Sequence, residues 1–295
     1  MQTYIKILLT LIPLVSLTSV TNYYSSTVNK DDTISKESQS QSITKKEVDA
    51  IKETMPFADS IIGNYKLSKE PCNSENFLKT TVPIVSKRFY KRHQIKHIKH
   101  RIERIYSKYG DYIKKASALT QVPENLIVSI IFIESNGHER SLNKKSGATG
   151  LMQLTQSSCS DILYLKNKMG QLTQIEKHII KKSLGNRLDC ILGMQHMGQK
   201  KLCNGKTGFN VSEEDLYNPE FNILCGAIFL SVLIENHTEK GLVRLDKIVA
   251  GYSVGLFSKI KGKTPEEVMQ YTNKETRSYI EKLAGTNGVL RVMSI

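Results

Sequence analysis

Glu134 is the residue of this sequence that is best placed to do chemistry. It ends the apolar run 126–133, and Ser135, Asn136 and Gly137 follow it directly. A carboxyl group beside so many apolar side chains loses hydration, which favours its protonated form and raises its pKa. Such a group can hold a proton near neutral pH and give it to a leaving oxygen. The alternative is an amphipathic helix whose glutamate only reaches solvent at the helix end.

The element that positions Glu134 is predicted to be a helix. The β-branched residues of the run 126–133 would also suit a buried strand. Pro123 suits a first helical position, however, and Gly137 suits a C-terminal stop. In a helix, Glu134 lies one turn beyond Ile130, on an apolar face. This placement predicts the loss of hydration that an acid catalyst needs.

Four blocks in the sequence, in a fixed order, resemble the signatures of a known family. Residues 146–154 read SGATGLMQL and follow the Glu134–Ser135 pair, and 218–226, 250–255 and 275–279 read NPEFNILCG, AGYSVG and ETRSY. They resemble the GAxGLMQ, DPxxNIxxG, AYNAG and ETRxYV motifs of the soluble, lysozyme-like lytic transglycosylases of bacteria. The resemblance covers about residues 112–285. It implies a mainly α fold with a lysozyme-like (α+β) catalytic domain.

The resemblance also implies the residues of the site. Glu134 would be the only acid/base, and Gln153 and Tyr252 would face the glycan groove. The Tyr252 hydroxyl would bond to Glu134 or to the sugar and steady the charge that develops. Glu275 matches a position that contacts the muropeptide in family members.

Two departures from the family pattern bear on substrate contact. Asn143 stands where the family often has serine, with one extra residue before Gly147, and Ser253 replaces the usual asparagine after the tyrosine. An asparagine amide still donates a hydrogen bond. We therefore expect Asn143 and Ser146 to contact substrate, with altered fine specificity.

The reaction that the resemblance implies is cleavage of peptidoglycan without hydrolysis. Protonated Glu134 would give its proton to the oxygen between N-acetylmuramic acid and N-acetylglucosamine, and the substrate's acetamido group would support the cationic centre. Glu134 would then take the proton of the 6-hydroxyl, which closes a 1,6-anhydro ring. No cofactor, no metal and no second carboxylate are needed, unlike in two-carboxylate glycosidases. By analogy alone, the enzyme would open the wall locally for a secretion apparatus.

Two other activities fit the same motifs. A hydrolytic muramidase of this fold would need a second acid to position water, and Asp161 and Asp189 are the candidates. A non-catalytic wall-binding or assembly protein would keep the groove and need no glutamate. The intact Glu134–Ser135 pair speaks against that last reading.

The length of 295 residues and the composition predict an exported chain with one substantial domain. Residues 1–21 have the basic start, apolar run and small residues of a signal peptide, so we expect a periplasmic protein, with an uncleaved anchor as the alternative. Nothing later is expected to span a membrane. Residues 22–86 are polar and are predicted to be a disordered tether. The catalytic domain is placed at 111–285 and a tail at 286–295.

Residues 87–110 are predicted to form a basic amphipathic helix ahead of the domain. Isoleucine recurs in it at helical spacing, as Ile95, Ile98, Ile102 and Ile105. The whole chain carries a formal charge of +14. Nucleic acid is the usual partner of such a run, but an exported chain rarely meets it. We expect no nucleic-acid partner and a peripheral contact of 87–108 with wall or anionic membrane; a solvated face without a partner is the alternative.

A helical insertion is expected at about 157–215, where the chain is longer than the family pattern. Cys190 and Cys203 lie inside it, Cys159 lies at its start, and Cys225 follows it. Four cysteines in one exported domain predict two disulfides. Of the three pairings possible, we favour Cys190–Cys203 with Cys159–Cys225. The insertion could extend the groove, contact a partner or only decorate the surface.

Overall fold

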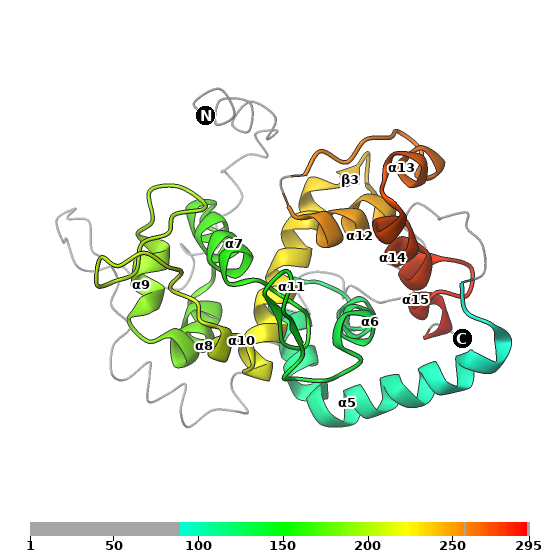
Figure 1. Ribbon diagram of the computed structural model, residues 1–295, viewed down its shortest axis with the longest axis horizontal. Helices are drawn as coiled ribbons and strands as arrows, with labels where there is room; N and C mark the ends of the chain where they lie inside the picture. Colours follow the sequence, from blue (N-terminus) through cyan, green and yellow to red (C-terminus); the bar gives the residue numbers. More distant parts are fainter. Residues whose placement is uncertain (1–88, 257, 294–295) are drawn as a thin grey trace, which may run out of the picture. The chain divides into compact units, whose positions relative to one another are not determined.

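The computed structural model describes residues 89–256 and 258–293 (Figure 1). The expected signal peptide 1–21, tether 22–86 and first residues of the basic helix lie outside these described residues. The helices are α5 (Arg92–Thr120), α6 (Glu124–Ser135), α7 (Gln156–Lys168), α8 (Gln174–Leu184), α9 (Arg187–Leu192), α10 (Glu213–Leu216), α11 (Pro219–Asn236), α12 (Leu245–Val254), α13 (Pro265–Tyr271), α14 (Lys274–Ala284) and α15 (Val289–Val292). The described strands form two short antiparallel hairpins, β1 (Leu142–Asn143) with β2 (Ala148–Thr149), and β3 (Thr238–Glu239) with β4 (Leu242–Val243). The structure is therefore mainly helical, as the sequence predicts.

Helix α11 is the centre of the core, and it contacts α5, α6, α7, α8, α10 and α12. Its N-terminus is fixed by Asn218, whose side-chain oxygen accepts from the Phe221 N–H, and by Pro219 in the first turn. Contrary to our expectation, this helix is long and apolar enough to cross a membrane by composition. However, 67% of the span is buried inside the molecule. A helix that is apolar on all sides and packed in this way is a core helix.

Helix α5 is one continuous helix of 29 residues. The sequence analysis separated a basic helix ending at 110 from the domain that begins at 111, and the structure joins them. Ile98, Ile102 and Ile105 are buried as predicted, and the apolar stripe continues through Tyr109 and Ile113. Glycine inside a helix costs about 1 kcal/mol relative to alanine. The unbroken stripe packs against α6 and α11, which keeps Gly110 helical.

The end of the described chain also belongs to the packed domain. Residues 286–295 were expected to be a tail, but α15 lies within them. Val289, Leu290 and Val292 are buried, and α15 contacts α5, α6 and α14. Burial of these apolar side chains removes their surface from water, which stabilises the folded state. The segment is therefore part of the core.

The segment expected as an insertion, 157–215, contains all of α7 but its first residue, α8, α9 and most of α10. The Cys190–Cys203 disulfide that the sequence predicts is present and ties α9 to the loop that follows it. Arg187 at the start of α9 donates two hydrogen bonds, of 2.6 and 2.8 Å, to the Asp215 carboxylate in α10. A bidentate pair of this kind fixes orientation as well as distance. Both links lie within the segment and join its parts to one another.

The expected Cys159–Cys225 disulfide was wrong. Both residues are free and fully buried, where α7 packs against α11. Burial and the neighbouring Cys159 thiol raise the pKa of the Cys225 thiol well above its usual range. The pair therefore behaves as small apolar side chains in the core, which is the common role of a buried cysteine.

Candidate active site

The Glu134 carboxyl lies in the last turn of the predicted helix, now α6, with Ile130 and Ile131 fully buried behind it. The helix begins at Glu124, so Pro123 caps it rather than opening its first turn, and it ends where Asn136 turns left-handed. Burial raises the pKa of Glu134 to about 7, against smaller lowering effects of the Tyr279 hydrogen bond and the Lys282 charge. The side chain remains partly exposed. It is therefore an acid that holds a proton near neutral pH and can still reach a ligand.

Ser135 ties the end of α6 to the glycine-bearing loop. Its hydroxyl lies 2.7 Å from the Leu151 carbonyl oxygen, to which it donates, and it accepts from the Gly137 N–H at 3.2 Å. Leu151 belongs to the 146–154 block. The serine of the Glu-Ser pair thus holds the catalytic turn against that loop.

Asn222 holds the other side of the same loop. Its fully buried side chain accepts from the Met152 N–H at 2.8 Å and donates to the carbonyls of Thr149 and Leu216 at 3.1 and 2.9 Å. Gly150 has a φ of +81°, and a side chain there would collide with the Leu216 carbonyl and the Asn222 amide. The loop follows this path because only glycine fits so close to the asparagine.

Tyr252 and Gly226 complete the support of the loop at Met152. The Tyr252 hydroxyl donates to the Met152 carbonyl at 2.9 Å, and a side chain at position 226 would collide with the Met152 thioether. The expected hydrogen bond of Tyr252 to Glu134 is not formed, because the buried hydroxyl lies next to this backbone acceptor instead. Tyr252 is therefore a residue that positions the loop.

Tyr279 is the residue that the sequence analysis missed. It lies on α14, which packs against α6, and its hydroxyl donates to the Glu134 carboxylate at 2.7 Å. Burial and the nearby Glu134 carboxyl raise the pKa of Tyr279 well above its usual range, so the hydroxyl stays a neutral donor. The signal was present in the 275–279 block, in which the family resemblance pointed to Glu275. Glu275 is exposed in the first turn of α14, where an acidic side chain favours the helix end.

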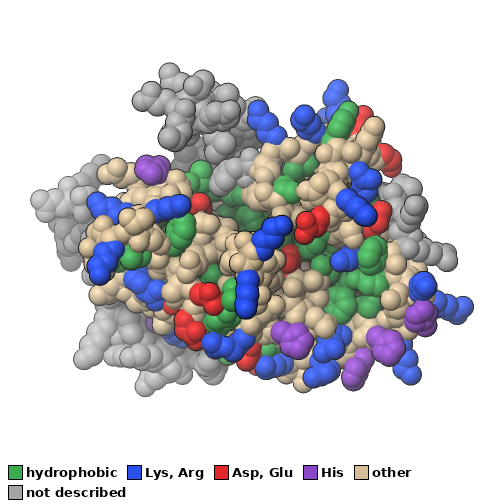
Figure 2. Space-filling model, viewed as in Figure 1, with side chains coloured by type: hydrophobic (Ala, Val, Ile, Leu, Met, Phe, Trp, Pro, Cys, Tyr) green, Lys and Arg blue, Asp and Glu red, His purple; other side chains and the backbone are tan. Residues whose placement is uncertain are grey.

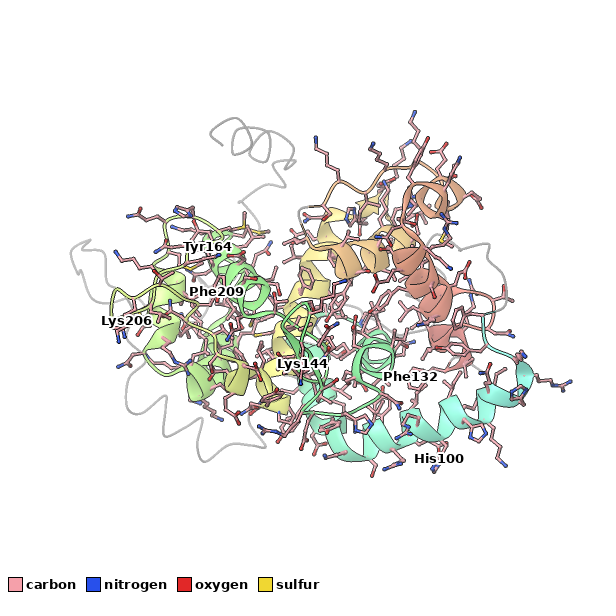
Figure 3. All side chains as sticks on the ribbon, in the orientation of Figure 1. His100, Phe132, Lys144, Tyr164, Lys206 and Phe209 are labelled. Atoms are coloured by element: carbon pink, nitrogen blue, oxygen red, sulfur yellow. A yellow bond between two sulfur atoms is a disulfide. The ribbon has the colours of Figure 1, made fainter. Side chains whose placement is uncertain are left out.

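The remaining predicted residues shape the hairpin loop between α6 and α7. Gln153, at a φ of +48°, donates to the carbonyls of Ser141 and Gly150 at 3.0 and 2.9 Å. The exposed Asn143 accepts from the Lys145 and Ser146 backbone, and the exposed Ser146 accepts from the Ala148 N–H. The Asn143 oxygen is thus used within the turn, and the substrate contact expected of Asn143 stays a prediction. Figure 3 locates this hairpin by Lys144 and α6 by Phe132.

The two acids proposed as partners for a hydrolytic reaction have other contacts. Asp161 accepts from the Gly198 N–H at 2.7 Å, and Asp189 lies 3.7 Å from the Lys181 ammonium. Both contacts lie within the 157–215 segment. Within the described residues, no group of three His, Cys, Asp or Glu side chains could hold a metal ion.

Comparison with known proteins identifies the domain that carries this site. Residues 111–180 match the family model of the transglycosylase SLT domain, which confirms the resemblance to a soluble lytic transglycosylase-type domain. The mainly helical architecture agrees with the lysozyme-like SLT fold. The match contains Glu134 and the 146–154 block and continues past residue 157 into α8. A search of curated proteins found no match. At the level of the family, the domain is a glycan-cleaving one that acts on peptidoglycan.

Proposed function

We propose that this protein cleaves the β-1,4 bond between N-acetylmuramic acid and N-acetylglucosamine without water, with Glu134 as its only acid/base. The observation that carries the proposal is the Glu134 carboxyl itself, half-buried, with a pKa of about 7 and a neutral tyrosine as its donor. At neutral pH such a group exists in both protonation states, and the two halves of the reaction require one state each.

Glu134 acts first as a general acid. Its proton goes to the bridging oxygen, and the bond from that oxygen to the muramic C1 breaks. The electron deficiency at C1 is met by the substrate's own acetamido oxygen. The carboxylate that remains is stabilised by the Tyr279 hydrogen bond at 2.7 Å and by the positive charge of Lys282.

Glu134 acts next as a general base. The carboxylate takes the proton of the muramic 6-hydroxyl, and the 6-oxygen forms a bond to C1 as the acetamido oxygen leaves. The product is a 1,6-anhydro ring, and Glu134 is protonated again for the next cycle. No water is consumed and no second carboxylate takes part.

The hydrogen bonds that fix the 146–154 loop support this chemistry. Ser135, Asn222 and Tyr252 each fix the backbone of residues 149–152 by hydrogen bonds. A surface held on three sides can keep a glycan within reach of Glu134 at little entropic cost during reaction. Asn222 comes from the 218–226 block and Tyr252 from the 250–255 block, so two of the blocks converge on the 146–154 loop.

Digestion of purified peptidoglycan in ¹⁸O-labelled water tests the reaction. The expected products are anhydro-ended muropeptides without label, because the sugar's own hydroxyl closes the ring. Reducing ends that carry ¹⁸O would show a hydrolytic muramidase and would direct attention to Asp161 and Asp189. Wall binding without any product would show a non-catalytic protein.

The proposal includes the periplasm as the place of action, based on the signal peptide expected at 1–21. Local opening of the wall for a secretion apparatus is the role that such an enzyme would have there. Cell fractionation tests the location: the mature chain is expected in the periplasmic fraction, without residues 1–21. Recovery in the cytoplasm would contradict it.

A further inference from the structure

A cavity lies where α5 meets the turn that follows α6. It has a volume of about 340 Å³, and the residues that line it include Arg101, Arg104, Ser107 and Lys108 from α5, and Asn136 and His138. This volume falls at the lower end of the range for small-molecule sites. Glu134 is not among the residues that line it.

The α5 wall of the cavity carries three basic residues, and two of them have no acidic partner. Arg101, Arg104 and Lys108 share one helix face by their spacing. Lys108 is paired with Glu139 at 3.0 Å. Within the described part of the chain, neither Arg101 nor Arg104 has a carboxylate at ion-pair distance. Like charges on one helix face destabilise it, and an anion between the two guanidinium groups would remove that cost.

The opposite wall is a fixed turn of backbone. Asn136 and Gly137 both have positive φ, and a side chain at Gly137 would come within 2.8 Å of Ile105. The Tyr109 hydroxyl binds the Glu139 carboxylate at 2.9 Å, which holds that acid beside Lys108. The C-terminal end of α6 adds only a partial negative charge, smaller than the two full charges opposite. The cavity is thus preformed and electropositive.

We propose that this cavity binds a phosphate group. A guanidinium donates two parallel hydrogen bonds to an oxyanion, and a carboxylate has oxygens for only one such fork. A phosphate has enough oxygens for both Arg101 and Arg104. A phosphate monoester carries about −1.5 to −2 charges at pH 7, which matches the two unpaired guanidinium groups. Ser107 and His138 also line the cavity, and their side chains carry further hydrogen-bonding groups.

The surface around the cavity suits an approaching anion. Figure 2 shows Lys, Arg and His side chains along the lower right edge of the molecule, where Figure 1 draws α5. His100, labelled in Figure 3, belongs to this surface. Such a field raises the rate at which anions arrive. The phosphate could be free in solution or could be the headgroup of a lipid.

Titration of the full-length protein with inorganic phosphate, at constant ionic strength, tests the site. Calorimetry is expected to show saturable binding to the wild type. Replacing both arginines, as Arg101→Gln with Arg104→Gln, should weaken binding at least tenfold. The matched control is Lys96→Gln with Lys99→Gln, which removes the same charge from exposed positions of α5 outside the cavity. The control should bind like the wild type.

Two outcomes would overturn the proposal: a control that loses as much affinity as the arginine variant, or a wild type without saturable binding.

Vesicles with phosphate-monoester headgroups, compared with carboxylate vesicles of equal charge, identify the source. Binding of the wild type to the phosphate vesicles that the arginine variant loses would assign a lipid headgroup; binding of inorganic phosphate alone would assign a soluble ligand. None of these measurements uses glycan cleavage, so the failure of the proposed function would leave them unaffected.

Discussion

The Tyr279 hydroxyl donates a 2.7 Å hydrogen bond to the Glu134 carboxylate across 145 residues of sequence. The tyrosine favours the ionised form of Glu134 and burial favours the protonated form, and burial has the larger effect. The pKa of about 7 is the outcome of these opposing effects. An acid/base that must both give and take a proton is best served by such a value.

Replacing Glu134 with glutamine should abolish wall cleavage. Glutamine keeps the shape of the side chain but cannot deliver a proton, and the loss of general acid catalysis typically costs about 10²–10⁴-fold. Release of anhydro-muropeptides from purified wall measures the effect, with circular dichroism as the control for folding. Near-normal turnover in a folded variant would mean that another residue is the acid.

The same Glu134→Gln variant should be more stable than the wild type at high pH. The pKa of Glu134 is about 7 in the folded state and near 4.5 in the unfolded chain, so the folded state binds the proton more tightly. Wild-type stability therefore falls as pH rises from about 4.5 to 7, by up to about 3 kcal/mol. Urea unfolding at pH 4 and pH 8 checks this. The prediction would be contradicted if wild type and variant differed in free energy of unfolding by the same amount at pH 4 and at pH 8.

Tyr279→Phe should move the pH dependence of cleavage. The phenylalanine removes the donor that favours ionised Glu134, so the pKa of Glu134 rises above about 7. The decline of activity on the alkaline side should shift to higher pH, and the maximal rate should fall because the developing carboxylate loses support. Tyr252→Phe is the control, since its hydroxyl binds the Met152 carbonyl. If both variants moved the alkaline limb equally, Tyr279 would have no special coupling to Glu134.

Asn222→Ala should unfold the loop that Ser135 ties to the end of α6. It removes the partners of the Met152 N–H and of the Thr149 and Leu216 carbonyls, and buried groups left unpaired cost about 1–3 kcal/mol each. We expect a loss of at least about 2 kcal/mol in the free energy of unfolding, together with lost activity. Asn143→Ala, at an exposed site, should change stability by less than about 0.5 kcal/mol. A rise in KM for Asn143→Ala alone would locate the substrate contact expected there.

Peptide mapping without reductant should recover Cys190 joined to Cys203, and Cys159 and Cys225 as thiols. The two thiols are fully buried, so an alkylating reagent should reach them only after denaturation. Reduction of the bridge should cost about 3 kcal/mol, because it releases a loop of this length in the unfolded chain. A Cys159–Cys225 bridge in the purified protein would show that the core contact becomes oxidised.

The sequence by itself determined the features that depend on neighbours in the chain. The flanking Pro123 and Gly137 predict a helix for the apolar run before Glu134, and the helix in turn predicts the loss of hydration, because it brings residues one turn apart onto one face. The 146–154 block predicts a glycine-bearing turn, since Gly147 and Gly150 supply conformations that other residues avoid. The isoleucine stripe of α5 and the Cys190–Cys203 bridge also depend on residues that are close in the sequence.

The tertiary structure decided the partners that come from distant parts of the chain. Which tyrosine reaches Glu134 depends on how α12 and α14 pack. In this packing the Tyr279 hydroxyl bonds to the Glu134 carboxyl, and the Tyr252 hydroxyl bonds to the Met152 carbonyl. The thiols of Cys159 and Cys225 meet in the core, but contact alone does not make a bridge. The cavity beside Arg101 exists only because the end of α6 lies against α5. Local patterns fix which groups a helix presents, and only the packing of the helices fixes which groups meet.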